Sequence, residues 1–285
     1  MEGLSKIKER IRLLLNFKVP PYLMDHQFQG RAVLPAVEAM EVLAASTQAH
    51  LPETPVNAMG NARFDKFLPI ENGVNEIRAF NDLEIQDDGR VVSKLLTKTQ
   101  SKKAKITRTK EHAVLCFGDG LGKPSPRRFH MPKTTGYHVP SETVYERLVP
   151  FGPAYHNLRE GVTLWEEMVT ATVYAPENGG TDGILGSPFP LDAAFHAACV
   201  WGQRYAGVVG FPVGFGIRKV FSVTKAKNTY QAVLLPKKLV LNGFLLDVWI
   251  TGRGGTAKEV VLGLVMKDVS GGRKKPPPWI LNQTI

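Results

Sequence analysis

The chain has 285 residues, of which 43% are hydrophobic, so it can bury a full core in one large domain or two smaller packed ones, which excludes a disordered protein. It contains no apolar run of about 18 residues, and its amino-terminal segment has a short apolar part without a small-residue cleavage site. We therefore expect no membrane span and no signal peptide, and a cytoplasmic location. The formal net charge at pH 7 is +10.

The first predicted helix covers residues 36–50, "AVEAMEVLAASTQAH", directly after Pro35. Proline suits the first turn of a helix, and this segment is apolar on nearly every face, which is typical of a helix surrounded by protein. His26 precedes the helix by a few residues, and Gly30 between them is a position where the backbone can approach closely. His26 is therefore a candidate for catalysis as well as for a structural role.

The positive charge is concentrated between residues 90 and 133, where twelve Lys or Arg residues accompany two acidic ones. Such a region could attract nucleic acid, an anionic membrane surface or an acidic protein. The alternative is a solvated pair of strands, because basic residues alternate here with β-branched ones as they do on exposed strands. RNA-binding signatures with clustered aromatic residues are missing, so nucleic acid is the weakest of these partners.

Residues 118–141 have the Gly-rich, Pro-rich and basic composition of a linker. Short β-rich runs follow the linker, bounded by turn residues, at 161–175, 227–236, 243–252 and 259–269. We expect an amino-terminal unit, a linker, a carboxy-terminal unit and an extended exit segment, with boundaries at 1–124, 125–144, 145–270 and 271–285.

The second predicted helix follows Pro190 and reads "LDAAFHAACVWGQRYAG". Asp192 stands at its second position, and His196 lies one turn later on the same face. A buried helix start is a costly place for an aspartate unless the carboxylate caps free amides or takes part in chemistry.

Shifting the chain by 155 residues places Leu34-Pro35 over Phe189-Pro190 and superposes the two predicted helices. The chain then consists of two copies of one unit, each a buried helix wrapped by antiparallel strands. Chance similarity of two Ala-rich helices is the alternative. The counterpart of His26 is threonine and that of Asp192 is valine, so each copy holds half of a His and Asp pair. If the units pack face to face, His26 and Asp192 meet in one cleft.

Cys116 and Cys199 lie in apolar surroundings without Cys-x-x-Cys spacing, which indicates buried thiols rather than a disulfide or zinc framework. The histidines outside these motifs show no metal-ligand spacing, so we expect no metal site. The glycine-rich stretches "GDGLGK" and "GRGGTAK" open no helix and are interpreted as turns.

Four stretches in order resemble the dehydratase domains of polyketide and polyunsaturated fatty acid synthases. "HQFQGRAVLP" is similar to their His-x3-Gly-x4-Pro motif and "LDAAFH" to their Asp-x3-Gln/His motif. "FGPAYHNL" resembles their Tyr-Gly-Pro-x-Phe segment, and "FPVGFG" a loop that borders their substrate tunnel. The resemblance implies an α+β double hot dog fold, with two antiparallel sheets each wrapped around a buried central helix.

Three departures from this pattern concern the tunnel. Ala36 stands where the family usually has glycine after the proline, and Phe151 replaces the usual tyrosine. The Gly-Tyr pair expected just before Phe151 is Leu148-Val149. The histidine and the aspartate of the two motifs are both present.

The resemblance implies a hydro-lyase that converts 3-hydroxyacyl thioesters on an acyl carrier protein to 2-enoyl thioesters in polyketide or fatty acid biosynthesis. His26, kept neutral in an apolar pocket, would take the α-proton. Asp192, with a pKa raised by burial, would donate a proton to the leaving hydroxyl, with His196 orienting it. The amino end of the first helix would stabilise charge on the thioester oxygen. This elimination needs no metal or nucleotide, and the substrate would be carried on the phosphopantetheine of the carrier protein.

The resemblance also suggests a set of substrate-binding residues and partners. The set comprises Gly30, Pro35, Ala36, Gly152, Pro153, Tyr155, His196 and Pro212, with packing as the favoured role of Tyr155. Carrier proteins are acidic, so the basic region 90–133 is a candidate docking surface. Other synthase domains and a second copy of the chain are further expected partners. The alternatives are a hot dog isomerase, a product-template cyclase and a non-catalytic acyl-binding protein with the same fold, with a nucleic-acid-binding module last.

Overall fold

An antiparallel sheet of twelve strands organises the computed structural model, which describes residues 5–100, 107–118, 121–122, 124–125, 129–177 and 183–281. The order across the sheet is β1-β5-β6-β7-β4-β11-β14-β13-β12-β10-β9-β8. The strands are β1 (Ile7–Lys18), β4 (Ala58–Arg63), β5 (Glu76–Gln86), β6 (Val91–Gln100), β7 (Thr107–Phe117), β8 (Tyr137–Val139), β9 (Leu158–Leu164), β10 (Val169–Tyr174), β11 (Phe211–Val220), β12 (Thr229–Val240), β13 (Gly243–Thr251) and β14 (Ala257–Lys267). A separate hairpin consists of β2 (Gln27–Phe28) and β3 (Arg31–Ala32).

Two long helices and several short helical segments accompany the strands. The long helices are α1 (Ala36–His50) and α3 (Phe189–Trp201). The short segments are α2 (Ser141–Thr143), η1 (Pro21–Asp25), η2 (Val144–Leu148), η3 (Pro153–Tyr155), η4 (Gly202–Ala206) and η5 (Arg253–Gly255). None of the helices in the described ranges combines the length and the apolar character that a bilayer crossing requires.

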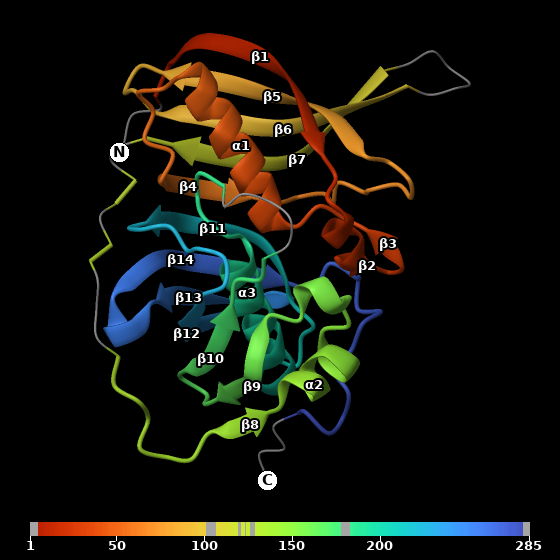
Figure 1. The fold of residues 1–285 in the computed structure, drawn as a ribbon, viewed down its shortest axis with the longest axis vertical. Coiled ribbons are helices and arrows are strands. Elements are labelled where there is room, and N and C mark those ends of the chain that lie inside the picture. Colours follow the sequence, from red (N-terminus) through yellow and green to blue (C-terminus); the bar gives the residue numbers. More distant parts are fainter. Residues whose placement is uncertain are drawn as a thin grey trace.

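The sheet has two halves, each curved around one long helix (Figure 1). Strands β1, β5, β6, β7 and β4 surround α1, and the seven strands from β11 to β8 surround α3. Strands β4 and β11 pair antiparallel, with Gly214 opposite Arg63 and Lys219 opposite Ala58, so the two sheets are continuous at their meeting edge. The α+β double hot dog prediction is confirmed, with a shared edge that the sequence did not indicate.

The two long helices differ in how far they are buried. Every residue of α3 is buried, as its Ala-rich sequence, apolar on nearly every face, predicts. A small residue is required where α3 continues into η4, because a Cβ on Gly202 would overlap the ring of Phe244. Helix α1 instead buries one face, with Val37, Met40 and Leu43 on the core side.

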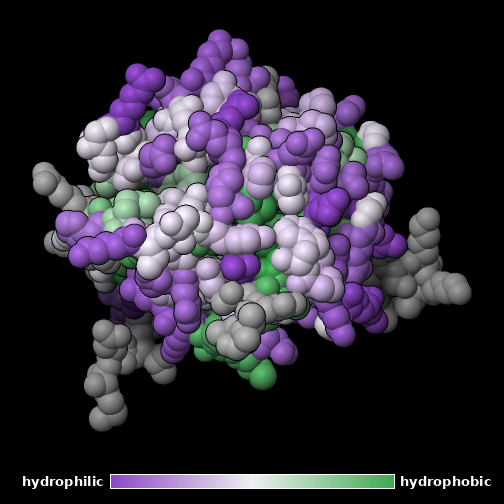
Figure 2. Space-filling view, turned by 90° about the horizontal axis from the view of Figure 1, so that it is seen from below, coloured by the Kyte–Doolittle hydropathy of each residue, from purple (hydrophilic) through white to green (hydrophobic). Residues whose placement is uncertain are grey.

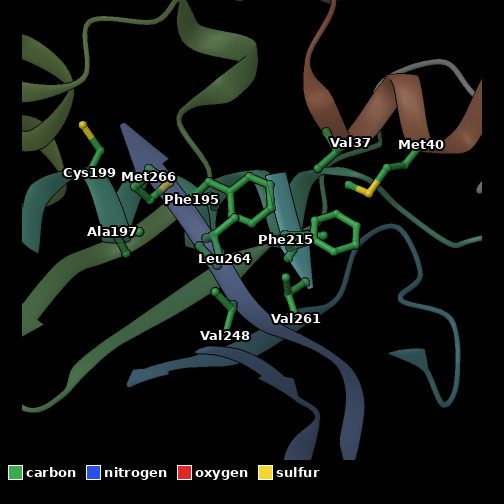
Figure 3. Packing of buried hydrophobic residues seen from close by; sticks show 14 of the residues in the cluster. Val37, Met40, Phe195, Ala197, Cys199, Phe215, Val248, Val261, Leu264 and Met266 are labelled. Atoms are coloured by element: carbon green, nitrogen blue, oxygen red, sulfur yellow. The ribbon is translucent and has the colours of Figure 1, made fainter. Parts of the chain in front are cut away.

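The core passes without interruption from one half to the other (Figure 3). In this core Val37 and Met40 of α1 lie above Phe215 of β11, and Phe195 of α3 belongs to the same buried cluster. Beneath α1 lies a buried ion pair in which the guanidinium of Arg218 donates to Oε2 of Glu259, with Nε at 2.8 Å and Nη2 at 2.6 Å. The pair joins β11 to β14 beside the seam between the halves.

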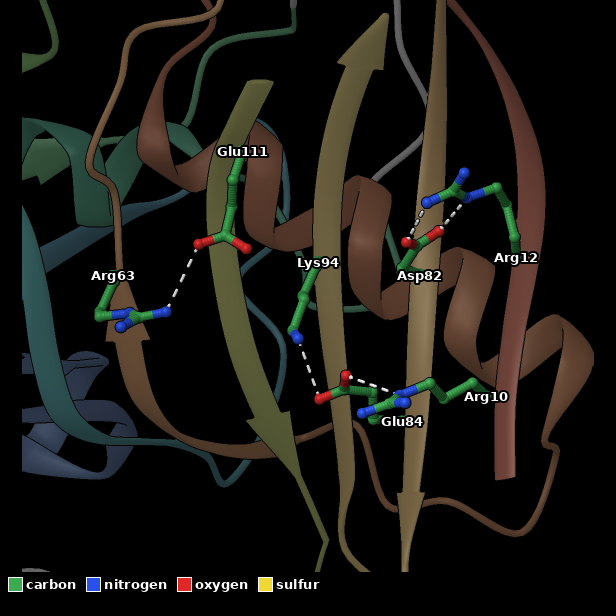
Figure 4. A network of polar contacts seen from close by, with 7 residues as sticks. All are labelled: Arg10, Arg12, Arg63, Asp82, Glu84, Lys94 and Glu111. Carbon is green, nitrogen blue, oxygen red and sulfur yellow. Dashed lines mark hydrogen bonds and ion pairs between the residues drawn. The ribbon is translucent and has the colours of Figure 1, made fainter. Parts of the chain in front are cut away.

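The basic region 90–133 lies mainly on β6 and β7, and six of its twelve basic residues fall outside the described residues. Of the others, Arg90 pairs with Asp88 at 2.7 Å and Lys94 pairs with Glu84 at 2.9 Å. Cross-strand pairs of this kind cover the outer face of the amino-terminal sheet (Figure 4). The ion pairs of Arg90 and Lys94 fit the solvated strand pair, and docking of an acidic protein to this region stays a prediction.

The predicted linker and tail both contain ordered structure. The range 125–144 includes β8, which pairs with β9 at the edge of the sheet, and α2. In the predicted exit segment Ile280 is buried, and its carbonyl oxygen accepts a hydrogen bond from Nη1 of Arg204 at 3.2 Å. Residues 271–281 therefore fold against the carboxy-terminal half, because an apolar side chain anchors them. The face seen in Figure 2 is mainly hydrophilic, with hydrophobic residues in small separate areas.

Candidate active site

A cavity of about 380 Å³ lies where the two halves meet. The amino-terminal half contributes His26 and the first turn of α1, and the carboxy-terminal half contributes Phe151, one face of α3 and the start of β11. Most of the lining is aromatic or aliphatic. Its titratable lining residues include His26, His112, Asp192, His196 and Cys199, and an apolar cavity with a few convergent polar groups is typical of a ligand site.

The imidazole of His26 is fixed by its own half of the chain. Its Nδ1 lies 3.0 Å from the carbonyl oxygen of Val33, to which Nδ1–H donates. The N–H of Val33 donates back to the carbonyl oxygen of His26 at 2.9 Å. The β2–β3 hairpin returns the chain for this exchange, with Gly30 in its turn at a φ of 75°. Gly30 thus shapes the turn and has open space around it, whereas the sequence analysis predicted a close backbone approach.

Electrostatics keep His26 neutral. Burial lowers the pKa of His26 and outweighs the opposing effect of the Asp192 carboxylate, and His196 lowers it further. A neutral imidazole whose Nδ1 donates a hydrogen bond carries its lone pair on Nε2. His26 therefore offers an unprotonated ring nitrogen, as expected of a general base.

Asp192 and His196 form a buried pair on α3, in which Asp192 is the fourth residue rather than the predicted second. Nε2 of His196 lies 3.0 Å from Oδ2 of Asp192, although the ring N–H is not aligned well enough for a regular hydrogen bond. The hydroxyl of Tyr145 accepts from the N–H of Leu158 at 3.0 Å and lies 3.4 Å from Nδ1 of His196. If Tyr145 donates to Nδ1, the hydrogen on Nε2 faces the carboxyl group.

The pKa of Asp192 departs from the sequence-based expectation. Burial alone would raise this pKa, as predicted, but the neighbouring His196 and then His26 lower it below the ordinary value. The first turn of a helix also favours a negative charge. The expectation of a raised pKa was therefore wrong in direction, because it counted burial without the two imidazoles.

The ring of Phe151 contacts both His26 and His196. Its ring stacks on His26 with the centroids 4.4 Å apart and lies 5.0 Å from the ring of His196. The backbone beside it is held by Asp25, whose Oδ2 accepts from the N–H of Ala154 at 2.9 Å and whose carbonyl oxygen accepts from the N–H of Gly152 at 2.8 Å. These bonds join the segment before His26 to a loop of the other half.

Several lining residues were missed by the sequence analysis. Phe195, Cys199 and Gln203 lie on the face of α3 and η4 that also carries Asp192 and His196. Helical spacing from Asp192 could have identified them, since residues three, seven and eleven positions along share one side. Burial raises the pKa of Cys199 to about 11, so this thiol is protonated at pH 7.

The structure brings together some of the expected substrate-binding residues and separates others. His26, Ala36, Asp192, His196 and Pro212 line the cavity. Outside its lining lie Gly30, Pro35, Gly152, Pro153 and Tyr155. Tyr155 is buried behind His26, with ring centroids 5.1 Å apart, which fits its favoured packing role. Among the described residues, no three His, Cys, Asp or Glu side chains gather as metal ligands would.

Comparison with solved structures identifies the fold. The chain superposes on a dehydratase domain from the CurF module of the curacin polyketide synthase with a TM-score of 0.73 and 14% identity, covering 93% of this chain and 96% of that one. A dehydratase domain of a mycocerosic acid synthase-like polyketide synthase gives a TM-score of 0.74, 17% identity and coverage of 92% and 95%. A trans-AT polyketide synthase dehydratase domain from Brevibacillus brevis gives a TM-score of 0.74 and 16% identity, and the superposition covers 93% of this chain and 95% of that one.

One curated relative is similar in sequence. It is a polyunsaturated fatty acid synthase subunit of Thraustochytrium sp., which is 27% identical over 206 residues. The match covers 70% of this chain and 7% of that protein. No family model matches the chain.

Proposed function

We propose that the chain is a dehydratase that removes water from 3-hydroxyacyl thioesters to give 2-enoyl thioesters. The observation that carries this proposal is the convergence of His26 and Asp192, from opposite halves, on one apolar cavity. Solved structures with the same fold are dehydratase domains, and the curated relative belongs to a polyunsaturated fatty acid synthase. Both similarities support the same reaction class.

The elimination begins at His26. Its unprotonated Nε2 takes the proton from the α-carbon of the substrate, because Nδ1 is already committed to the carbonyl oxygen of Val33. The electrons of the broken C–H bond form the new double bond as the β-carbon–oxygen bond breaks. The stacked ring of Phe151 excludes water from one side of the imidazole.

The departing hydroxyl takes its proton from the buried Asp192–His196 pair and leaves as water. Because Asp192 is ionised in the empty site, its carboxylate takes up one proton from solvent as the substrate binds and donates it to the leaving oxygen while the C–O bond breaks. His196, whose Nε2 lies 3.0 Å from Oδ2, holds the carboxyl group in place. The proton on Nε2 of His26 then returns to solvent, which restores both groups and balances the proton that Asp192 took up. This division of roles is the one that the family resemblance implies, with Asp192 as the proton donor and His196 as the residue that orients it.

The start of α1 supplies the dipole for the thioester oxygen. Ala36 lines the cavity and is the first residue of the helix, whose first-turn N–H groups have no partner within the helix. Such amides stabilise negative charge that develops on an oxygen. Alanine in place of glycine adds one methyl group to the wall of the cavity at this point.

The proposed substrate is an acyl chain on the phosphopantetheine of an acyl carrier protein, within polyketide or fatty acid biosynthesis, with no metal or nucleotide cofactor. The chain spans about 7% of the length of its curated relative, so other synthase domains are proposed neighbours. A homodimer, expected from the family resemblance, stays a prediction.

The test is loss of water from a 3-hydroxyacyl carrier protein, followed by mass spectrometry. We expect a loss of 18 mass units, about the mass of one water, with the wild type and more than a 100-fold lower rate with His26→Ala and with Asp192→Asn, since general acid–base groups contribute about 10²–10⁴-fold. His138→Ala, an exposed histidine outside the cavity, is the matched control and should keep the wild-type rate.

Three other outcomes would contradict the proposal. A shifted double bond without net loss of water would indicate an isomerase, and a cyclised product would indicate a cyclase. Tight acyl binding without turnover would indicate a non-catalytic protein with the same fold.

A further inference from the structure

The hydroxyl group of Tyr145 lies between the backbone and the imidazole of His196. Tyr145 is buried in η2, and its hydroxyl oxygen accepts a hydrogen bond from the N–H of Leu158 at 3.0 Å. The same oxygen lies 3.4 Å from Nδ1 of His196, and the two rings stand at 86° to each other. Because the backbone N–H already donates to the oxygen, the hydroxyl hydrogen is left to point at Nδ1.

The hydroxyl of Tyr145 keeps its hydrogen at neutral pH, because burial raises the pKa of the phenol and the charge of Asp192 raises it further. A buried O–H group without an acceptor costs free energy, and the described residues place Nδ1 of His196 within hydrogen-bond distance of this one. The bond forms only when Nδ1 has no hydrogen of its own. The neutral imidazole then carries its hydrogen on Nε2, on the side of Asp192.

Two other imidazoles surround this arrangement. His26 is neutral because burial lowers its pKa, so it brings no positive charge to His196. His156 stacks on the ring of Tyr145 with the centroids 4.2 Å apart and the planes at 13°, and its Nε2–H donates to the carbonyl oxygen of Phe151 at 2.8 Å. The stack and the backbone bond therefore fix the phenol ring from two sides.

The place of one proton decides whether the Asp192–His196 pair can act as an acid. In the proposed mechanism the pair takes up one proton as the substrate binds, and this proton can be on the carboxyl group or on Nδ1 of the imidazole. An imidazolium would leave Asp192 as a carboxylate with nothing to donate. It would also turn Nδ1–H toward the hydroxyl of Tyr145, whose own hydrogen would lose its acceptor. Tyr145 thus disfavours the imidazolium.

We propose that Tyr145 is a positioning residue that keeps Nδ1 of His196 unprotonated and so leaves the proton of the pair on the carboxyl group of Asp192, where the leaving hydroxyl can receive it. The inference rests on the proposed function and deepens it. Tyr145 does not line the cavity, so it acts through His196. The role requires histidine at position 196, because glutamine, which the Asp-x3-Gln/His motif also allows, carries its N–H hydrogens on one fixed nitrogen.

A double-mutant cycle in the dehydration assay tests this role. Tyr145→Phe keeps the ring that stacks on His156 and removes the hydroxyl. We expect kcat to fall about five- to tenfold with KM within about twofold of the wild type, since one hydrogen bond corresponds to roughly this factor. In the His196→Gln background the same substitution should change kcat by less than about twofold. An equal fall of kcat in both backgrounds would overturn the inference, because the hydroxyl would then have only a structural role.

The ring nitrogens of His196 give a second readout that needs no turnover. In protein labelled with ¹⁵N-histidine, long-range proton–nitrogen correlation spectra distinguish protonated from unprotonated ring nitrogens, and His196→Gln assigns the signals. With an unreactive thioether analogue of the substrate bound at pH 7, we expect hydrogen on Nε2 alone in the wild type. Tyr145→Phe should show hydrogen on both nitrogens in a measurable share of the molecules. Hydrogen on Nδ1 in the wild type, or identical spectra of the two proteins, would overturn the inference.

Tyr230→Phe is the matched control. Tyr230 is also buried, and its hydroxyl oxygen accepts from the N–H of Lys225 at 2.7 Å, but it lies outside the cavity lining. This variant should keep the wild-type kcat and the wild-type signals of His196. A fall of kcat equal to that of Tyr145→Phe would overturn the inference, because the loss of any buried hydroxyl would then suffice. If the wild type removes no water, the proposed function fails, and the spectrum of the free protein still decides whether Nδ1 is unprotonated.

Discussion

The contact between Asp25 and the loop of the other half allows a quantitative prediction about catalysis. Asp25→Ala removes the carboxylate that accepts the N–H of Ala154 at 2.9 Å, next to the segment that stacks Phe151 on His26. A hydrogen bond to a charged group contributes about 1.5–3 kcal/mol, and the partial exposure of Asp25 places this one at the lower end. A loss of about 1.5 kcal/mol corresponds to roughly a tenfold change in rate.

We therefore expect Asp25→Ala to lower kcat about tenfold, with KM little changed because Asp25 does not line the cavity. Asp25→Asn keeps a side-chain oxygen that can accept the same N–H, so it should retain most of the activity. The assay is steady-state dehydration of a 3-hydroxyacyl thioester mimic, with thermal unfolding measured in parallel. If Asp25→Ala keeps kcat within about twofold while its melting temperature falls, the contact serves stability only and the positioning argument is refuted.

Three further predictions concern stability and pH. Replacing Arg218 by Met leaves Glu259 buried without its partner, so the free energy of unfolding measured by urea titration should fall by about 3–5 kcal/mol. The double variant Arg218→Met with Glu259→Leu removes the unpaired charge and should recover most of this loss. A double variant that recovers nothing would contradict the ion-pair argument. The lowered pKa of His26 means that the unfolded chain binds more protons just below pH 6.5, so the free energy of unfolding should fall as the pH drops below 6.5, and a His26→Gln variant should lack this part of the stability loss. The value of kcat/KM should instead hold through pH 6.5 and fall only when the pH reaches the lowered pKa of His26 in the folded enzyme. Gly202→Ala should destabilise the fold by about 1–3 kcal/mol through overlap with Phe244, which an unchanged thermal midpoint would refute.

The parts of the fold that repeat could be predicted from the sequence. The two Ala-rich helices and the 155-residue offset between them predicted two helix-centred units, and the split of His26 and Asp192 between the copies predicted a shared cleft. Both inferences follow from local patterns: helix propensity, a proline in the first turn and apolar character on all faces. The cavity contains both residues.

The features that could not be predicted from the sequence depend on contacts between segments far apart in the chain. The direction of the pKa shift at Asp192 is set by two imidazoles, one of them 166 positions away in the chain, and burial by itself gives the opposite sign. The Pro-rich and basic composition of the carboxy-terminal segment predicts an extended exit segment and gives no sign of the anchoring role of Ile280. No local pattern indicates that Lys274 and Cys199 line the same cavity.

The pairing of β4 with β11 has a mechanical consequence. His26 and Asp192 belong to different halves of the chain, so the distance between them changes if the two halves shift along the β4–β11 pairing. Displacements of about 1 Å can lower an enzyme's rate by about two orders of magnitude. Catalysis should consequently be the most sensitive reporter of seam integrity. Under gentle denaturation, turnover should vanish while the circular dichroism of both sheets still looks native.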